Sequence, residues 1–329
     1  MSQKTAPAKA VFLDIDTVDP GDLNRSVLDG LELDWSYLDS ATTRTPGPYL
    51  AEATIAVTNK VPIDRATIAS APALELICVA ATGYNQIDLE AATERGIPVC
   101  NARDYATPSV VQHTFGLILA LSTNLLAYHN AVRAGRWERA TTFALLDYPI
   151  WELSGRTLGI VGYGVLGQAV ANLARAFGMQ VLIAQRPGGD DRRAGRVPLD
   201  ALLAQIDVLS LHCPLSEQTR GLIDAARLEA MRPGALLINT ARGAIIDEPA
   251  LAEALRTGRI GGAGLDVLSL EPPVDGNPLL APDIPNLIIT PHTAWASRES
   301  RQRLLGEVAD NIKAFRRGTP RHAVNSPER

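Results

Sequence analysis

Cysteine, lysine and aromatic residues are scarce in this sequence, and each shortage carries information. The three cysteines form no CxxC pair, which argues against a zinc site and a disulfide scaffold and fits a reduced protein. Aromatic residues make up 5% of the chain, lysine is much rarer than arginine, and the formal net charge is −5. A chain with this charge balance has no basic surface of the kind that binds nucleic acid, so we expect no such partner.

Long hydrophobic runs and targeting segments are also missing. The apolar stretch over residues 110–126 is interrupted by polar residues, whereas a membrane-spanning helix needs about 20 mainly apolar residues. We therefore predict a buried core helix there and no membrane contact. Residues 1–9 are polar and lack the apolar core of a signal peptide, so we expect a cytoplasmic protein.

The hydrophobic content of 46% over 329 residues is enough for about two domains with a core each. Short apolar runs alternate with helical patterns, which is typical of parallel sheets built from βαβ units. A first group of predicted strands spans residues 10–14, 54–58 and 76–79, with a helix near residues 89–95. A second group spans residues 157–161, 181–184, 208–211, 235–239, 263–266 and 287–290. This order predicts an α/β fold with doubly wound parallel sheets.

Helix signals support this organisation. Asp247 precedes a first turn that contains Pro249, which places a capping side chain before a position that tolerates proline. Ser297 opens a long amphipathic stretch that stops at Gly318. Because that stretch follows the last strand, we expect its helix to return to the first domain, which makes that domain discontinuous. The polar residues 187–196 are predicted to form a surface loop.

The first strand of the second group runs directly into a glycine-rich turn, Gly162-Tyr163-Gly164-Val165-Leu166-Gly167. In such a loop Gly162 allows the tight turn, Gly164 lets the backbone approach a pyrophosphate, and Gly167 lets helix and strand pack closely. The following helix N-terminus offers N–H groups to phosphates. The strand–turn–helix context favours a dinucleotide site over a glycine turn without ligand, while a methyltransferase stays open as an alternative at this point.

Polar side chains follow the last three predicted strands. Arg242 comes after the fourth strand of the group, Asp266 and Glu271 come at and after the fifth, and His292 comes after the sixth. Ligands of an open α/β sheet bind beyond the carboxyl ends of its strands, on the side where the glycine loop lies. We therefore expect these side chains to meet at one site.

This set of side chains suits the reduction of a 2-keto acid. An arginine grips a carboxylate or polarises a ketone through its planar fork of donors. A histidine donates a proton to the carbonyl oxygen as hydride arrives, and a nearby carboxylate stabilises the imidazolium. Each residue alone is also typical of a surface ion pair or a solvated turn. Among the other histidines, we predict His113 as a satisfied core residue, His129 and His322 as surface residues, and His212 as a neighbour of adenine.

Six segments resemble the D-2-hydroxyacid dehydrogenase family and occur in its order over essentially the whole chain: residues 162–167, 211–215, 239–243, 264–267, 271–272 and 291–292. Residues 143–152 and 292–295 are most similar to the glycerate dehydrogenases of that family, also called hydroxypyruvate reductases. The resemblance implies two Rossmann-like domains, namely a flavodoxin-like substrate domain of residues 1–102 plus 293–329 and an NAD(P)-binding domain of residues 103–292. It also implies a homodimer whose partners exchange an arm around residues 145–151.

The resemblance further implies a role for individual residues. His292 and Glu271 match the proton-transfer pair, and Arg242 matches the residue that anchors the substrate. The implied substrate contacts are Ala81, Thr82, Gly83, Arg242, His292 and Trp295. The implied cofactor contacts are Thr107, Gly162, Gly164, Val165, Leu166, Gly167, Gln185, Arg186, Cys213, Pro214, Thr240, Ala241 and Asp266, the last at the nicotinamide carboxamide. No metal is expected.

One departure from the family pattern bears on the cofactor. NAD-selective enzymes carry an acidic residue about 20 residues beyond the glycine loop, whose charge repels a 2′-phosphate. Gln185 stands at that position and is neutral. Arg186, Arg192 and Arg193 on the same loop offer cationic donors, partly cancelled by two neighbouring aspartates. We therefore expect use of both cofactors, with NADP(H) favoured over NAD(H).

The leading interpretation is an NAD(P)-dependent reductase of small 2-keto acids such as hydroxypyruvate and glyoxylate, with D-glycerate and glycolate as products. A D-lactate or phosphoglycerate dehydrogenase is the alternative within the family. The loop over residues 80–86 contains no lysine or arginine to meet a phosphate, which counts against phosphoglycerate. A dinucleotide-sensing corepressor is the alternative from another class, but it does not need the complete set of Arg242, Glu271 and His292.

Overall fold

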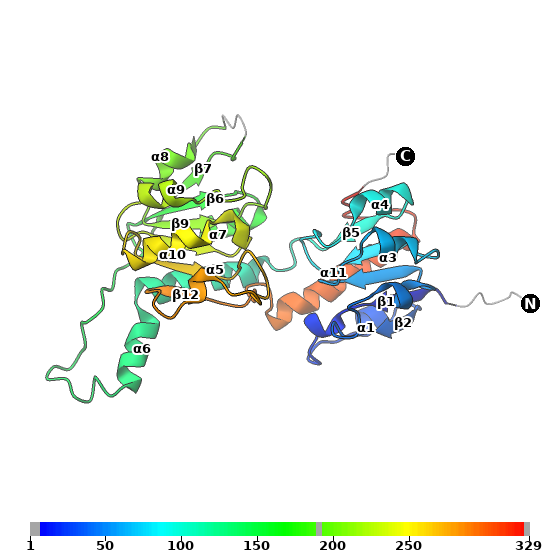
Figure 1. Cartoon of the computed structure of the whole chain (residues 1–329), viewed down its shortest axis with the longest axis horizontal. Helices are drawn as coiled ribbons and strands as arrows, with labels where there is room; N and C mark the ends of the chain where they lie inside the picture. Colours follow the sequence, from blue (N-terminus) through cyan, green and yellow to red (C-terminus); the bar gives the residue numbers. More distant parts are fainter. Residues whose placement is uncertain (1–6, 189–192, 326–329) are drawn as a thin grey trace, which may run out of the picture. The chain divides into compact units, whose positions relative to one another are not determined.

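The computed structural model describes residues 7–188 and 193–325, and the chain divides into two compact units (Figure 1). The described residues up to Ala106 and those from Trp295 onward form one unit, and Thr107–Ala294 form the other. From the sequence we expect these changeovers at residues 102/103 and 292/293. The first unit is discontinuous because the C-terminal helix joins the N-terminal part of the chain.

The sheet of the first unit is parallel and has the strand order β2-β1-β3-β4-β5. This 2-1-3-4-5 order is that of flavodoxin-like sheets. The strands are β1 (Lys9–Phe12), β2 (Asp34–Tyr37), β3 (Ile55–Thr58), β4 (Leu76–Val79) and β5 (Val99–Asn101).

Helices cover both faces of this sheet. On one face, α1 (Ser26–Asp29) and α11 (Arg298–Arg316) pack against residues such as Phe12. On the other face, Leu13 lies in a cluster with residues of α2 (Gly47–Leu50), α3 (Arg65–Ala69) and α4 (Leu89–Glu94). A short 3-10 helix, η1 (Ile15–Thr17), follows β1.

The three strands that the sequence predicts in this sheet are present, and β2 and β5 are added to them. β2 is an edge strand whose residues alternate between exposed and half-buried, so it contains no continuous apolar run. β5 is only three residues long. Neither strand therefore carries the pattern by which a buried strand is recognised in a sequence.

The sheet of the second unit is also parallel and has the order β12-β11-β10-β9-β6-β7-β8. Its strands are β6 (Thr157–Val161), β7 (Gln180–Ala184), β8 (Arg196–Val197), β9 (Val208–Leu211), β10 (Leu236–Asn239), β11 (Gly262–Leu265) and β12 (Leu287–Ile289). The strand order reverses between β6 and β9. Their carboxyl ends therefore flank the topological switch point at which such sheets bind ligands.

The six predicted strands of this sheet are all present, but the count of six was wrong because β8 adds a seventh at the edge. Its first residue, Arg196, closes the stretch that we predicted as a surface loop. Two residues are too few to show a period, and β8 is defined only by its pairing with β7. Of the predicted loop, residues 189–192 lie outside the described residues.

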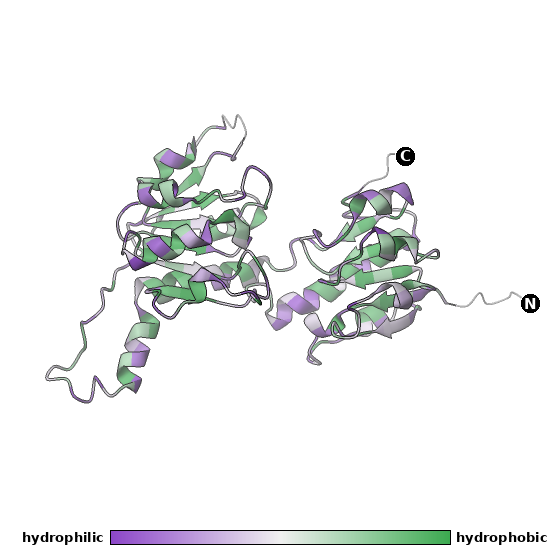
Figure 2. Ribbon diagram, in the orientation of Figure 1, coloured by the Kyte–Doolittle hydropathy of each residue, from purple (hydrophilic) through white to green (hydrophobic). Residues whose placement is uncertain are grey.

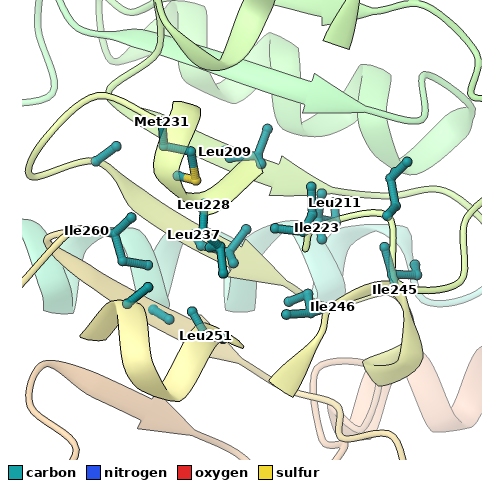
Figure 3. Packing of buried hydrophobic residues seen from close by; sticks show 14 of the residues in the cluster. Leu209, Leu211, Ile223, Leu228, Met231, Leu237, Ile245, Ile246, Leu251 and Ile260 are labelled. Carbon is teal, nitrogen blue, oxygen red and sulfur yellow. The ribbon is translucent and has the colours of Figure 1, made fainter. Parts of the chain in front are cut away.

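Two buried clusters hold helices to the faces of this sheet. On one face, α5 (Thr107–Ser122) and α7 (Val165–Ala176) pack on the strands. On the other face, α8 (Leu199–Leu203), α9 (Ala225–Ala230) and α10 (Glu248–Arg256) do so. Figure 3 shows the second cluster, in which Leu209 and Leu237 of the sheet lie among residues such as Leu228 and Leu251. The central strands are hydrophobic along most of their length (Figure 2), as expected for a sheet covered on both faces.

The apolar stretch predicted as one core helix is divided into two helices. α5 buries residues such as Phe115 and Ile118 and ends at Ser122. Asn124 then adopts a left-handed conformation with φ of 51° before α6 (Leu125–Arg133) begins. Among the described residues, no single helix meets the length and hydropathy criteria for crossing a membrane, and α5 with α6 meets them only as a pair bent by 60°.

Both predicted helix starts are present. The Asp247 side chain accepts a hydrogen bond from the Ala250 N–H at 3.0 Å and begins α10. The Ser297 side chain accepts one from the Ser300 N–H at 3.2 Å and begins α11. Capping by these side chains satisfies N–H groups that the first helical turn leaves without a backbone partner.

Candidate active site

The glycine loop lies at the carboxyl end of β6, and its three glycines differ in what surrounds them. Gly162 has a φ of 91°, and a Cβ there would lie 2.5 Å from the Cys213 nitrogen. A Cβ at Gly167 would lie 2.1 Å from the Gly162 oxygen, so the turn can close only without side chains. Gly164, by contrast, caps α7 without a side-chain hydrogen bond, and no atom lies within 4 Å of the place where its Cβ would stand.

These surroundings pass a simple test of fit for a dinucleotide. Gly162 and Gly167 are required by packing, whereas the space above Gly164 is not used by the protein's own atoms. The first N–H groups of α7 point out of the helix end at this place, where the helix dipole favours a phosphate. Val165, the first residue of α7, is 52% exposed, and Leu166 is half-buried. The loop therefore fits the pyrophosphate of a dinucleotide.

His292 and Glu271 form a close pair in the same unit. His292 Nδ1 lies 2.6 Å from Glu271 Oε2, and the two side chains are 28% and 34% exposed. The other carboxylate oxygen of Glu271 accepts a hydrogen bond from the Leu268 N–H at 2.8 Å. A ring that donates its Nδ1–H to a carboxylate is held in one tautomer and orientation, with Nε2 on the opposite side of the ring.

The turn that carries His292 is held by Asp266. The Asp266 carboxylate accepts hydrogen bonds from the Thr293 and Ala294 N–H groups, both at 2.9 Å, and the Asp266 backbone oxygen accepts one from the His292 N–H at 2.8 Å. Only 1% of Asp266 is exposed. These bonds hold His292 in a left-handed backbone conformation, with φ of 55°, that a non-glycine residue rarely adopts.

His113 belongs to this network, which the sequence analysis did not predict. Thr290 Oγ1 donates to Asp266 Oδ1 at 2.6 Å and lies 2.9 Å from His113 Nε2. His113 is thus satisfied, as predicted, but it is not a core residue: 24% of its side chain is exposed, and its partner lies at a strand end. Its position within an apolar helix gave no signal for this contact, because Thr290 lies 177 residues away in the chain.

Arg242 lies at the neighbouring strand end, between β10 and the 3-10 helix η2 (Gly243–Ile245). Its guanidinium is part of a half-buried residue and donates one hydrogen bond, from Nη1 to the Ala241 oxygen at 2.7 Å. The Asn239 side chain donates to the Arg242 backbone oxygen at 2.9 Å and accepts from the Ala241 N–H at 2.9 Å. The backbone on both sides of Arg242 is therefore braced by Asn239.

The strands that carry these residues are neighbours. β10, β11 and β12 pair side by side in parallel, so their carboxyl ends meet at one edge. A Cβ at Gly243 would lie 1.9 Å from the backbone carbon of Leu268, which shows how closely the Arg242 segment approaches the Glu271 segment. The structure thus brings together the loops of Arg242, Asp266, Glu271 and His292.

His212 and Cys213, at the end of β9, are chemically unsuited to acid–base or nucleophilic roles at neutral pH. Burial lowers the pKa of His212 to about 4, so its ring is neutral, and its Nε2 lies 2.8 Å from Ser210 Oγ. Burial raises the pKa of the Cys213 thiol to about 11. A thiol with this pKa is protonated near pH 7 and is a poor nucleophile.

The edge formed by β7 and β8 adds a residue that the sequence analysis missed. The Gln185 N–H donates to the Val197 oxygen at 2.8 Å, and Arg186 next to it is exposed. The Arg196 guanidinium lies over the Tyr163 ring, 5.0 Å from its centroid, and donates to the Ala184 oxygen at 3.3 Å. Arg196 thus joins β8 to the glycine loop. This contact depends on the pairing of β8 with β7, so the sequence carries no signal for it. Arg193 is exposed, and Arg192 lies outside the described residues.

The remaining predicted residues are found at other strand and helix ends. In the second unit, Thr107 begins α5, Pro214 is exposed after β9, and Thr240 Oγ1, beside Ala241, lies 3.2 Å from Thr114 Oγ1. In the first unit, the oxygens of Ala81 and Thr82, next to Gly83, accept hydrogen bonds from the Ala102 N–H and the Asn101 side chain. Trp295 packs edge-on against Tyr105, with ring centroids 6.4 Å apart.

Comparisons with known proteins identify relatives of this chain in sequence and in structure. The family model described as D-isomer specific 2-hydroxyacid dehydrogenase, NAD binding domain, matches residues 115–294. A glycerate dehydrogenase of Methylorubrum extorquens is 44% identical, over 97% of this chain and 99% of its own length. A hydroxypyruvate reductase of Blautia hydrogenotrophica is 38% identical, over 96% of this chain and 99% of its own. The solved structure of an NADPH-dependent glyoxylate/hydroxypyruvate reductase from Sinorhizobium meliloti, in complex with NADP and malonate, matches with a TM-score of 0.80 at 30% identity and covers 99% of both chains.

Proposed function

The chain belongs to the D-isomer specific 2-hydroxyacid dehydrogenase family and is an oxidoreductase of 2-hydroxyacids, and we propose that it reduces hydroxypyruvate and glyoxylate. The products are D-glycerate and glycolate. The observation that carries the proposal is the His292–Glu271 pair, 2.6 Å apart, at the strand end next to Arg242. The names of the relatives support the choice of small, unphosphorylated keto acids.

His292, Glu271 and Arg242 each have a distinct role in the proposed reaction. Nicotinamide chemistry supplies the hydride when the cofactor is bound. His292 holds the proton on Nε2 for the carbonyl oxygen and takes it back in the reverse direction. Glu271 accepts the Nδ1–H, keeps the ring in this tautomer and stabilises its charged form. Arg242 grips the substrate carboxylate or carbonyl with its planar donors.

We assign the two units different roles. The unit of β6–β12 holds the cofactor through Gly162, Gly164 and Gly167, and through Asp266 at the nicotinamide carboxamide. The unit of β1–β5 is the substrate domain, in which the backbone N–H groups of the loop from Ala81 to Gly83 hold the substrate carboxylate. Trp295 and Thr107, at the two changeovers between the units, contribute to substrate and cofactor binding respectively.

We also assign the segment after α6 to pairing with a second copy of the chain. Figure 1 shows α6 and the chain that follows it extending away from the sheet of their own unit. Phe143 is 93% exposed, Leu146 87% and Trp137 54%. Apolar side chains gathered in this way on a surface are typical of a protein–protein interface. A homodimer formed through this arm buries them.

The proposed substrate class is tested by a panel of 2-keto acids assayed with the purified chain, each with NADH and with NADPH. We expect the highest kcat/KM with hydroxypyruvate and glyoxylate, and lower values with pyruvate and 3-phosphohydroxypyruvate. Turnover of 3-phosphohydroxypyruvate above that of hydroxypyruvate contradicts the proposal, and so does the absence of turnover with every keto acid of the panel.

The cofactor proposal is use of both nicotinamide dinucleotides with NADP(H) favoured. Gln185 carries no charge to repel a 2′-phosphate, Arg186 follows it, and the Arg196 guanidinium lies over Tyr163 at the same edge. We expect Arg186→Ala to raise the KM for NADPH by about tenfold, the loss of one charge-assisted hydrogen bond. The KM for NADH changes little, because only the phosphate loses a partner.

Arg175→Ala is the matched control, since this exposed arginine lies in the last turn of α7 and its guanidinium donates a hydrogen bond to the Asn172 side chain. Binding of 2′,5′-ADP and 5′-AMP, measured by calorimetry, gives the same comparison without turnover. A wild-type enzyme at least about tenfold more efficient with NADH overturns the NADP preference and leaves Gln185 as a ribose contact.

A further inference from the structure

Glu248 is a buried carboxylate that the proposed mechanism does not use. It is the first residue of α10, six positions after Arg242, and 7% of it is exposed. A carboxylate at a helix N-terminus is favoured by the helix dipole whatever it touches. The side chain of Glu248, however, turns away from its own helix, and its hydrogen bonds all reach the segment that carries Glu271.

Glu248 joins the two ends of that segment. Oε1 accepts a hydrogen bond from the Ser269 N–H at 2.7 Å, and Oε2 accepts one from the Asn277 side-chain amide at 2.8 Å. The Ser269 hydroxyl also donates to Oε2. Glu271 lies between Ser269 and Asn277 in the chain, so one carboxylate closes the segment into a loop and ties it to α10.

Few side chains of the loop itself are buried, although Leu268 before it and Leu279 after it lie in the hydrophobic core of the unit. Most of its residues are exposed, among them Val274, which is 77% exposed. Between Leu268 and Leu279 burial contributes little to the position of the loop, and Glu248 supplies a contact that reaches both of its ends. At the start of the loop, Leu268 donates its N–H to Glu271 Oε1 and packs against the Gly243 backbone. A shift of the loop therefore also moves the Glu271 carboxylate relative to His292.

We propose that Glu248 is a positioning residue for the proton-transfer pair: it holds the loop over residues 269–277 so that the Glu271 carboxylate stays within hydrogen-bond distance of His292 Nδ1. This inference rests on the proposed function of that pair. Glu248 plays a part for Glu271 similar to the one that Asp266 plays for His292, since Glu248 accepts one backbone N–H and two side-chain donors of the loop beside it, and Asp266 accepts two backbone N–H groups of its own loop. The loop of Glu271 and the loop of His292 are thus each held by their own carboxylate, and the 2.6 Å contact between His292 Nδ1 and Glu271 Oε2 joins them.

The test is a double-mutant cycle between Glu248 and Glu271, with Glu248→Gln and Glu271→Gln made singly and together. The amide of Glu248→Gln keeps the size of the side chain but sets an NH₂ group against a donor of the loop. We expect kcat to fall by about tenfold, since small misplacements of a catalytic group cost up to about 10²-fold. The KM for the keto acid and the Kd for NADPH, measured by fluorescence quenching, stay within about twofold because Arg242 and the glycine loop are untouched.

The cycle separates positioning from a general structural role. If Glu248 acts through Glu271, the double variant has the kcat of Glu271→Gln alone, because there is no carboxylate left to position. An equal loss of kcat from Glu248→Gln in both backgrounds overturns the proposal, as does an unchanged kcat in the single variant. Glu253→Gln, the same exchange at an exposed position of α10, is the control and is expected to leave kcat unchanged.

A second variant covers the case in which Glu248→Gln does not fold. Ser269 is exposed, and Ser269→Ala removes only the hydroxyl donor to Glu248 while its backbone N–H remains. We expect a smaller fall of kcat, about threefold, that again vanishes in the Glu271→Gln background. The assays use the keto acid with the highest turnover in the panel, so a wrong substrate assignment shows itself in the panel and a wrong role for Glu248 in the cycle.

Discussion

Exchange of His292 for alanine is expected to lower kcat for keto-acid reduction by about 10²–10⁴-fold, the range for loss of a general acid. His292 is the histidine whose Nδ1 lies 2.6 Å from a carboxylate at a strand end. His212 cannot replace it, because burial lowers its pKa to about 4 and its ring carries no second proton to donate at neutral pH. The loss is chemical rather than structural, since the backbone bonds of the turn to Asp266 do not involve the ring.

Steady-state kcat measures the effect, and the Kd for NADPH shows that the cofactor site is intact. His129→Ala is the control, because His129 is exposed on α6. A His292→Ala enzyme that keeps more than about a third of the wild-type kcat removes His292 from the proposed mechanism. The kcat of Glu271→Gln is expected to lie between those of the wild type and His292→Ala, since the ring stays in place without its anionic partner.

Exchange of Arg242 for alanine is expected to lower kcat/KM by about 10²-fold, mainly through a higher KM. Hydrogen bonds to charged groups are worth about 1.5–3 kcal/mol each, and every 1.4 kcal/mol is a factor of ten. The Arg242 backbone is braced by Asn239 on both sides, so the loop keeps its path without the guanidinium. Arg242→Lys is expected to be nearly as poor, because a point charge does not reproduce a planar fork of donors.

Initial rates over a range of keto-acid concentrations separate KM from kcat in both variants. Arg256→Lys serves as the control, because Arg256, the last residue of α10, forms an exposed ion pair with Asp283. An Arg242→Lys enzyme with the wild-type kcat/KM contradicts the anchoring role.

The parts of the molecule whose signals are local could be predicted from the order of the amino acids. All six predicted strands of the second sheet are present within a residue or two of their expected ends, because each is a short apolar run between turns, whether it is buried like β9 or half-buried like β12. Gly162 and Gly167 were recognisable because the turn between strand and helix leaves no room for side chains there, and Gly164 because it completes the spacing of a phosphate-binding loop. Arg242, Glu271 and His292 were recognisable because parallel strands end at one edge, so residues that follow successive strands come together.

The side chains that hold that site in place are recognisable only in the folded chain. The edge strands β2 and β8 are defined by backbone pairing with a neighbour and not by a hydrophobic period. His113, Arg196 and Glu248 carry no local mark of their contacts, since Thr290, Tyr163 and Ser269 are brought to them by the fold. A hydrogen bond to a distant residue depends on the path of the whole chain. Strand periods and turn glycines, by contrast, depend on residues next to one another, which is why the sequence contained the candidate site but not its supports.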